Sequence, residues 1–224
     1  MISIRQLDKK YYGKGVQTAV LDQLSLEIGQ GEFVCILGQS GCGKTTLLNI
    51  LGLLDYATGG EYELDGVNVM NLSRKQLAKY RNQKFGFIFQ EYHLISELNI
   101  LENVCVPMGY AGIGKKEREK RALELLENLN LAGKENKYPV QLSGGEKQRA
   151  AIARAIANNA EIILADEPTG SLDPQNGIIV MEKLKELNRQ GATVIMVTHD
   201  VELCRYGSRV IEIIKGRAYD RKTT

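Results

Sequence analysis

The sequence predicts an α/β fold with a mostly parallel sheet flanked by helices. Two short apolar segments rich in β-branched residues, 161–165 and 192–197, are typical of buried parallel strands. The helical pattern of residues 175–190 separates them and completes a βαβ unit. A third apolar run, 32–37, leads into a glycine-rich turn and then into residues 46–54, which are apolar enough for a packed helix. These segments are expected in one sheet.

The remaining elements before residue 90 are predicted from simple patterns. Apolar and polar residues alternate within residues 1–31, which favours antiparallel strands. Residues 60–69 alternate in the same way, and Asp65-Gly66 is a strong turn signal there. Residues 74–83 are polar and predict a helix, and 85–89 predict a buried strand. The N-terminal part is therefore expected to form an antiparallel β subdomain.

The middle of the chain, from about residue 91 to 158, has a helical pattern. We expect a helical subdomain inserted between the two halves of the sheet, within a single domain covering residues 1–224. The charged run 115–121 leads into an apolar-patterned helix, with Gly133 as its expected stop. A basic patch for lipid headgroups is one interpretation of this run, but its interleaved glutamates favour a solvated helix face.

Composition narrows the class of protein. A chain of 224 residues, 43% hydrophobic and 25% charged, can bury one sizeable core. Its net charge of +2 gives no reason to expect nucleic acid as a partner. The four cysteines lack C-x-x-C spacing and are interpreted as reduced thiols of a cytosolic protein. No apolar run approaches the roughly 18–20 residues of a membrane span, and the N-terminus is not a signal peptide.

The glycine-rich turn after 32–37 is the first candidate site. It reads Gly38, Gln39, Ser40, Gly41, Cys42, Gly43, Lys44 and Thr45, followed by Thr46. Its glycines allow several backbone N–H groups to point at one anion, and the following helix adds the positive end of its dipole. Lys44 is expected to bind the β- and γ-phosphates of a nucleotide, and the Thr45 hydroxyl to ligate Mg²⁺. A chance glycine-rich turn is the alternative.

Polar residues follow two of the predicted parallel strands. Asp166 and Glu167 come directly after 161–165, at the edge where an open parallel sheet binds its ligand. One carboxylate there can hold Mg²⁺, and its neighbour can accept a proton from an attacking water. His199 ends the next strand and is expected to contact the γ-phosphate. A turn or helix start, and a hydrogen-bonded core histidine, are the structural alternatives. His93 receives no role.

A second glycine-rich element lies at residues 142–149. Ser143 and Glu146 form a capping box, which predicts the start of a helix. Gly144 and Gly145 leave backbone amides facing outward, which is again an anion site. A plain helix cap is the alternative, although glycine costs roughly 0.8–1 kcal/mol against alanine inside a helix. The pattern leaves open whether the two anion sites meet on one nucleotide within one chain.

Together, these motifs resemble those of the ATP-binding cassette ATPases, over essentially the whole chain. The matching segments are the Walker A loop (38–45), the Q-loop glutamine (Gln90), the LSGGQ signature (142–146, with Glu146 in place of glutamine), Walker B with its glutamate (162–167), the D-loop (171–173) and the switch histidine (His199). Tyr11 stands where this family places an aromatic residue that stacks on adenine, and the adjacent Tyr12 leaves that register open.

The resemblance implies a P-loop NTPase fold and an ATPase that uses ATP and Mg²⁺. It implies that Tyr11 stacks on adenine, that Thr45 and Gln90, backed by Asp166, hold Mg²⁺, and that Glu167 polarises the attacking water. It further implies a head-to-tail homodimer, in which the signature segment Ser143–Glu146 of one copy covers the nucleotide on the Walker A loop of the other. The helical subdomain would contact an integral-membrane permease, and residues 91–98 would lie at that surface. The chain would then be peripheral on the cytoplasmic face of the membrane.

Finer details are similar to the group of macrolide exporters and lipoprotein-release transporters. The run 86–94, ending in Gln90-x-x-x-Leu94, and the run Asn103-Val-x-Val-Pro107 carry this similarity. Neither the cargo nor the direction of transport follows from it. A soluble cassette ATPase without a transport role remains the alternative. A GTPase is disfavoured because Asn136-Lys-Tyr-Pro139 lacks the aspartate that reads guanine.

Overall fold

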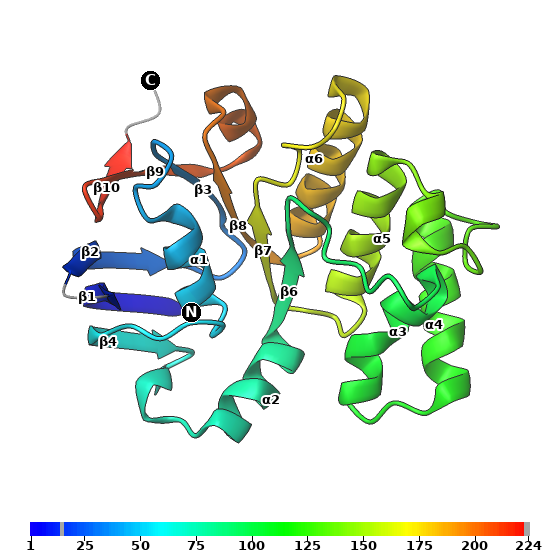
Figure 1. Ribbon diagram of the computed structural model, residues 1–224, viewed down its shortest axis with the longest axis horizontal. Coiled ribbons are helices and arrows are strands. Elements are labelled where there is room, and N and C mark those ends of the chain that lie inside the picture. The colour runs from blue at the N-terminus through cyan, green and yellow to red at the C-terminus, as the bar shows by residue number, and fades with distance from the viewer. Residues whose placement is uncertain (14–15, 222–224) are drawn as a thin grey trace.

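The structure, a computed structural model, describes residues 1–13 and 16–221, and its larger sheet is the predicted parallel one. Figure 1 shows this sheet crossing the centre of the molecule. Its strand order is β10-β9-β3-β8-β7-β6, and all neighbours are parallel except β10 and β9. The strands are β3 (Phe33–Leu37), β6 (Phe85–Ile88), β7 (Ile162–Asp166), β8 (Thr193–Thr198), β9 (Arg209–Ile214) and β10 (Arg217–Arg221).

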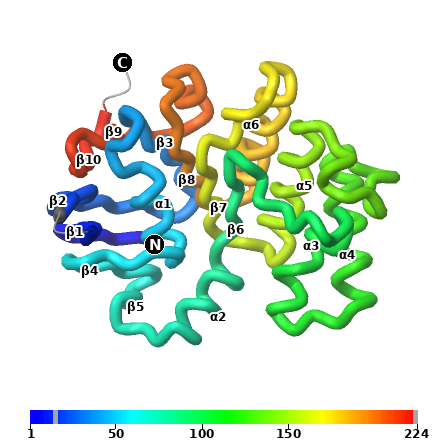
Figure 2. Tube along the Cα trace, in the orientation of Figure 1, coloured from blue at the N-terminus to red at the C-terminus, as the bar shows by residue number. Residues whose placement is uncertain are grey.

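The N-terminal strands form a second, antiparallel sheet, as expected. Its order is β2-β1-β4-β5, and it lies beside α1 in Figure 2. The strands are β1 (Ile2–Gly13), β2 (Val16–Ile28), β4 (Gly59–Leu64) and β5 (Val67–Asn68). Asp65 and Gly66 form the predicted turn between β4 and β5, with φ angles of 51° and 77°.

Helices cover the larger sheet. They are α1 (Lys44–Leu51), α2 (Arg74–Lys84), α3 (Ile100–Tyr110), α4 (Lys115–Asn128), α5 (Gly144–Ile156) and α6 (Pro174–Arg189), with short 3-10 turns η1 (Val69–Asn71), η2 (Pro139–Gln141) and η3 (Val201–Tyr206). In the part of the chain that the structure describes, no helix is long and apolar enough to cross a membrane.

The helix expected at residues 46–54 is shifted toward the N-terminus. It begins at Lys44 and ends at Leu51. After it, Leu53 adopts a left-handed φ of 58°, and the amide of Leu54 donates to the carbonyl of Asn49 at 2.8 Å. The apolar pattern continues past the end of the helix because Leu53 is still buried in the core.

The sheet separates two apolar cores. Alternate residues of β3 enter opposite sides: Val34 and Ile36 pack with the antiparallel sheet and α1, whereas Phe33 and Cys35 pack with α3–α6. Every residue of β3 and β8 is buried, as expected for central parallel strands. Both faces of the larger sheet are therefore covered by packed apolar side chains.

The middle segment is less uniformly helical than its pattern predicts. Residues 91–99 contain no helix, and α4 ends at Asn128 rather than near Gly133. The fully buried Asn103 explains the first difference. Its side-chain amide donates to the carbonyls of Ile95, Leu98 and Asn99, and its oxygen accepts from the amide of Ile95 at 2.7 Å. These bonds satisfy backbone groups that a helix would otherwise pair.

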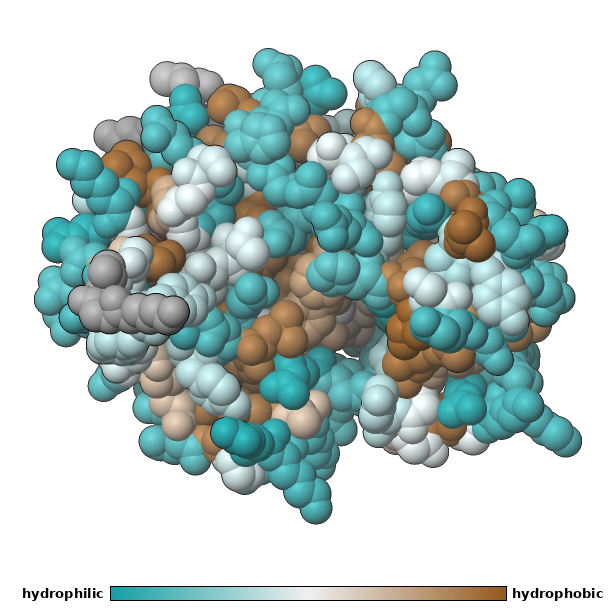
Figure 3. Space-filling view, viewed as in Figure 1, coloured by the Kyte–Doolittle hydropathy of each residue, from teal (hydrophilic) through white to brown (hydrophobic). Residues whose placement is uncertain are grey.

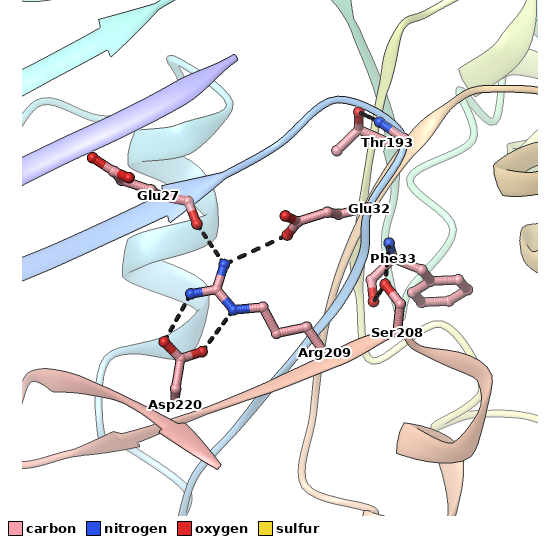
Figure 4. Close-up of polar contacts among 8 residues, drawn as sticks. Glu27, Glu32, Phe33, Thr193, Ser208, Arg209 and Asp220 are labelled. Carbon is pink, nitrogen blue, oxygen red and sulfur yellow. Dashed lines mark hydrogen bonds and ion pairs between the residues drawn. The ribbon is translucent and has the colours of Figure 1, made fainter. Parts of the chain in front are cut away.

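The C-terminal hairpin of β9 and β10 is an addition to the predicted sheet. Arg209 anchors it, as Figure 4 shows: the guanidinium binds Asp220 of β10 at 2.6 and 2.8 Å. It also donates to the carbonyl of Glu27 at 2.7 Å and lies 3.5 Å from the carboxylate of Glu32. The hairpin is thus tied to β2 and to the start of β3.

Helix α5 crosses β6 at very short range, and this contact gives a stability prediction. A Cβ at Gly86 would lie 2.3 Å from the carbonyl oxygen of Ala155. We expect Gly86→Ala to force the helix and strand apart and to lower the free energy of unfolding by about 1–3 kcal/mol. Urea denaturation measures it. Gly13→Ala is the control, since open space surrounds Gly13; equal stability of the two variants would contradict the close crossing.

Candidate active site

The phosphate loop, residues 38–45, is shaped by the helix that follows it. Gly43 precedes α1 with a left-handed φ of 105°, and no side chain caps the helix. The first amides of a helix lack intrahelical partners, and its dipole is positive at this end. Lys44 is buried, and its ammonium donates to the carbonyls of Gly38 at 2.7 Å and Gln39 at 3.0 Å. The loop is therefore a preformed anion site with its cation folded onto it.

The end of β7 meets this loop directly. The hydroxyl of Thr45, on α1, donates to Oδ1 of Asp166, the last residue of β7, at 3.2 Å. Burial raises the pKa of the Asp166 carboxyl, and the hydrogen bond from Thr45 acts against this rise. The structure thus brings together the two residues that the sequence assigned to one Mg²⁺ site.

Glu167 and His199 also meet at this edge. His199 follows β8, and its Nδ1 lies 2.8 Å from Oε1 of Glu167. The Glu167 side chain is largely buried, at 17% exposed, whereas the His199 side chain is 72% exposed. Glu167 has a left-handed φ of 45°, and its amide donates to the carbonyl of Val197 at 3.0 Å. Such a left-handed conformation is strained for a residue other than glycine.

Gln90 approaches the same edge from the neighbouring strand. It follows β6, which pairs in parallel with β7. Its amide lies against Gly170, where an added Cβ would be 2.9 Å from Nε2 of Gln90. Gln90 therefore lies over the loop that follows Glu167.

The adenine candidate lies on the antiparallel sheet. Tyr11, on β1, donates its hydroxyl to Oδ2 of Asp55 at 2.8 Å, and its ring is 45% exposed. Tyr12 is 74% exposed. Adjacent strand residues face opposite sides, so only one of the two can share a side of β1 with Asp55.

The capping box predicted for the second candidate anion site forms at the start of α5. The hydroxyl of Ser143 accepts from the amide of Glu146 at 3.3 Å, and the Ser143 amide donates to the Glu146 carboxylate at 2.8 Å. This backbone bond, helped by Lys134, holds the pKa of Glu146 below its usual value. Gly145 is required by packing, because a Cβ there would lie 2.1 Å from Oδ1 of Asn176. Gly144 lies near Tyr92 and Ser171.

The two anion sites have different surroundings within one chain. Around the phosphate loop, the carbonyl of Val20 lies close to Gly43, and β9 lies close to Gly38. The start of α5 instead packs against α6 and the segment after β6.

Three polar residues on α5 carry contacts that the sequence did not reveal. Gln148 is fully buried and donates to the carbonyl of Pro168 at 2.7 Å, and Arg149 donates to Asn176 at 3.1 Å. Arg154 donates to the carbonyls of Tyr92, at 2.8 Å, and His93. Burial lowers the pKa of Arg154. In the sequence, these residues stand out only as polar positions on a helix with an apolar face. That pattern does not identify the groups that they bind.

Comparison with known proteins agrees with this geometry. The sequence profile of the ABC transporter family matches residues 21–170. A macrolide export ATP-binding/permease protein, MacB, of Mannheimia succiniciproducens is 51% identical over 221 residues, which are 98% of this chain and 34% of that protein. The chain thus spans about a third of the length of the MacB relatives that it matches. An uncharacterized ABC transporter ATP-binding protein of Methanocaldococcus jannaschii is 52% identical over 208 residues, covering 92% of this chain and 93% of that protein.

Solved structures show the same fold. The dimeric structure of MJ0796, described as a bacterial ABC transporter cassette, has a TM-score of 0.92 and 43% identity, and each chain is fully covered. A post-hydrolysis dimer of the same cassette, bound to ADP and Pi, has a TM-score of 0.92 and 42% identity. The resemblance drawn from the motifs, including that to the macrolide exporters, is confirmed. The chain therefore belongs to the ABC transporter family and has the fold of its ATP-binding cassettes.

Proposed function

We propose that this chain hydrolyses ATP at the edge formed by the phosphate loop, Asp166, Glu167 and His199. The observation that carries this is the convergence of three elements: α1 meets β7 through Thr45 and Asp166, and β7 meets β8 through Glu167 and His199. Phosphoryl transfer to water depends mainly on positioning and electrostatic stabilisation, and this edge supplies both.

The phosphate loop binds the nucleotide. Lys44 exchanges its bonds to the carbonyls of Gly38 and Gln39 for bonds to the β- and γ-phosphates. The loop amides of residues 39–46 donate to the remaining phosphate oxygens. Tyr11 stacks on the adenine ring.

A divalent cation fits the groups next to the phosphates. Thr45, Gln90 and Asp166 present a hydroxyl, an amide oxygen and a carboxylate, and oxygen donors of this kind suit Mg²⁺. Phosphate oxygens of the bound nucleotide would supply further ligands. Mg²⁺ bound here would neutralise charge on the transferring phosphoryl group.

Glu167 acts on the attacking water. Its carboxylate accepts the hydrogen bond of the water and orients its oxygen toward the γ-phosphorus. His199, 2.8 Å away, holds this carboxylate in place and presents its exposed ring to the charge that develops at the γ-phosphate.

The site is completed by a second copy of the chain. The signature segment, residues 142–146, offers a second set of helix amides, which one chain places away from its own phosphate loop. Both structures of the MJ0796 cassette are described as dimeric. We place Ser143, Gly144, Gly145 and Glu146 of one copy on the γ-phosphate held by the other.

The dimer drives an integral-membrane permease from the cytoplasmic face of the membrane. The MacB relatives are named as proteins that combine an ATP-binding part with a permease. In this chain, the inserted helical segment, about residues 91–158, carries the permease contact, with residues 91–98 at its centre. The space-filling view shows a notch with apolar residues on its walls between the two halves of the molecule (Figure 3).

Removal of the carboxylate tests the role of Glu167. Glu167→Gln is expected to bind ATP normally, to lose about 10²- to 10⁴-fold in hydrolysis rate, and to accumulate as a dimer, because the bound nucleotide persists. Phosphate release and light scattering with saturating Mg-ATP measure the two effects. Glu182→Gln, on the exposed side of α6, serves as the control. A Glu167→Gln variant that stays monomeric would contradict the shared site.

A charge at the signature tests whether two chains share one nucleotide. Aspartate caps helices as well as serine does, so Ser143→Asp preserves α5 but places a negative charge against the γ-phosphate. In a Glu167→Gln background we expect unchanged ATP affinity per monomer and loss of the ATP-induced dimer, measured by calorimetry and light scattering. Ser73→Asp, at the equivalent cap of α2, is the matched control and should dimerise. A dimer of the Ser143→Asp variant would oppose the proposed contact.

Capture from membranes tests the transport role. The tagged chain is expected to co-purify with a protein that has several membrane spans, identified by mass spectrometry. Ile95→Asp should reduce this capture, whereas Ile214→Asp, on β9 outside the helical segment and similarly exposed at 47% against 40%, should not. Recovery of ribosomes or DNA without a membrane protein would instead support a soluble cassette without a transport role.

A further inference from the structure

An ion pair between a buried lysine and a partly exposed aspartate contacts Tyr11. The side chain of Lys9, two residues earlier on β1, is only 8% exposed. Its ammonium donates to Oδ1 of Asp55 and to the carbonyl of Tyr56, both at 2.7 Å. A buried charge is tolerated only when it is paired and hydrogen-bonded, so these bonds fix the positions of Lys9 and Asp55.

The same pair contacts Tyr11 at two points. Lys9 and Tyr11 are on one side of β1, and the ammonium lies 4.7 Å from the centroid of the Tyr11 ring. The second oxygen of Asp55 accepts the Tyr11 hydroxyl at 2.8 Å. Burial works against the ionised form of Asp55, but the bonds from Lys9 and Tyr11 outweigh it and lower the pKa of this carboxyl. These two contacts therefore fix the orientation of the Tyr11 ring before any ligand binds.

The pair of strands that carries Tyr11 contacts the phosphate loop through β2. Lys9 and Lys10 pair with Leu21 and Ala19 of β2, which leaves Val20 as a bulge between them. The carbonyl of Val20 is 2.9 Å from the position of a Cβ on Gly43, the residue just before α1. Asp55 follows the other end of α1. Helix α1 therefore connects the phosphate loop to Asp55, which in turn binds Lys9 and Tyr11.

We propose that Lys9 and Asp55 are positioning residues, which hold the Tyr11 ring as a preformed platform for the adenine base. The inference rests on the proposed function, in which Tyr11 receives the base. A cation on the ring and an anchored hydroxyl leave part of the ring exposed for stacking. Because the ring is already ordered, binding loses less side-chain freedom than it would with a free tyrosine. Tyr12, on the other side of β1, lacks this support from Lys9 and Asp55.

The test compares two ligands of the full chain, ADP and inorganic pyrophosphate, by titration calorimetry. Both bind the phosphate loop, but only ADP carries a base, so damage to the loop or the fold would weaken both. Tyr11→Phe keeps a ring for stacking and removes only its bond to Asp55. We expect it to weaken ADP about 2- to 12-fold and to leave pyrophosphate unchanged. Tyr12→Phe is the matched control and should change neither.

A second variant removes the support without touching Tyr11. Replacing both members of a buried ion pair by apolar residues is often neutral for stability, whereas replacing one is not. Lys9→Met/Asp55→Leu should therefore remain folded and weaken ADP selectively, as Tyr11→Phe does. Unchanged ADP affinity in both variants would overturn the inference.

Tyr11→Ala separates this inference from the proposed function. Loss of stacking should weaken ADP about 5- to 150-fold without affecting pyrophosphate. If Tyr11→Ala weakens ADP but the two supporting variants do not, Tyr11 binds the base without help from Lys9 and Asp55. If Tyr11→Ala has no effect and Tyr12→Ala does, the assignment of Tyr11 in the proposed function is wrong.

Discussion

The contact between α1 and the end of β7 is the constraint on which the site depends. Thr45 lies in the first turn of the helix that presents free amides, and Asp166 ends β7, a buried strand between β6 and β8. Their hydrogen bond therefore places the phosphate loop against the edge of the sheet. The parallel register then determines what surrounds it: β8 delivers His199 on one side, and β6 delivers Gln90 on the other. A change in the register of these strands would move all of these groups together.

Helix α5 connects that edge to the second anion site. Its first turn carries Ser143 and the glycines, and its buried face holds three loops of the same chain through Gln148, Arg149 and Arg154. Gln148 binds the segment after Glu167, Arg149 binds the start of α6, and Arg154 binds the segment after Gln90. Since each contact is a hydrogen bond to a backbone carbonyl or to an amide side chain, α5 cannot shift without disturbing the loops around the nucleotide. A partner that engages the signature segment therefore acts on both sites.

Much of this arrangement could be predicted, because the parallel strands, the phosphate loop and the capping box at Ser143 depend on local patterns. The hairpin of β9 and β10 was missed, although Val210–Ile214 is an apolar run before a turn at Lys215 and Gly216, because its anchor Arg209 bonds residues far away in the sequence. Local patterns also do not explain why residue 145 is glycine. A Cβ at Gly145 would clash with Asn176, which lies on another helix. The interruption at 91–99 depends on one buried side chain, Asn103, which no periodicity reveals.

The two bonds that Lys44 makes to its own loop have a consequence for ligand selection. The ammonium already donates to the carbonyls of Gly38 and Gln39, so an incoming anion must replace two hydrogen bonds to the loop. Chloride carries a single compact charge and makes too few contacts to compensate for the lost hydrogen bonds. A polyphosphate chain offers several oxygens to the ammonium and to the helix amides at once. The loop therefore favours polyphosphates over small anions such as chloride, independently of the base.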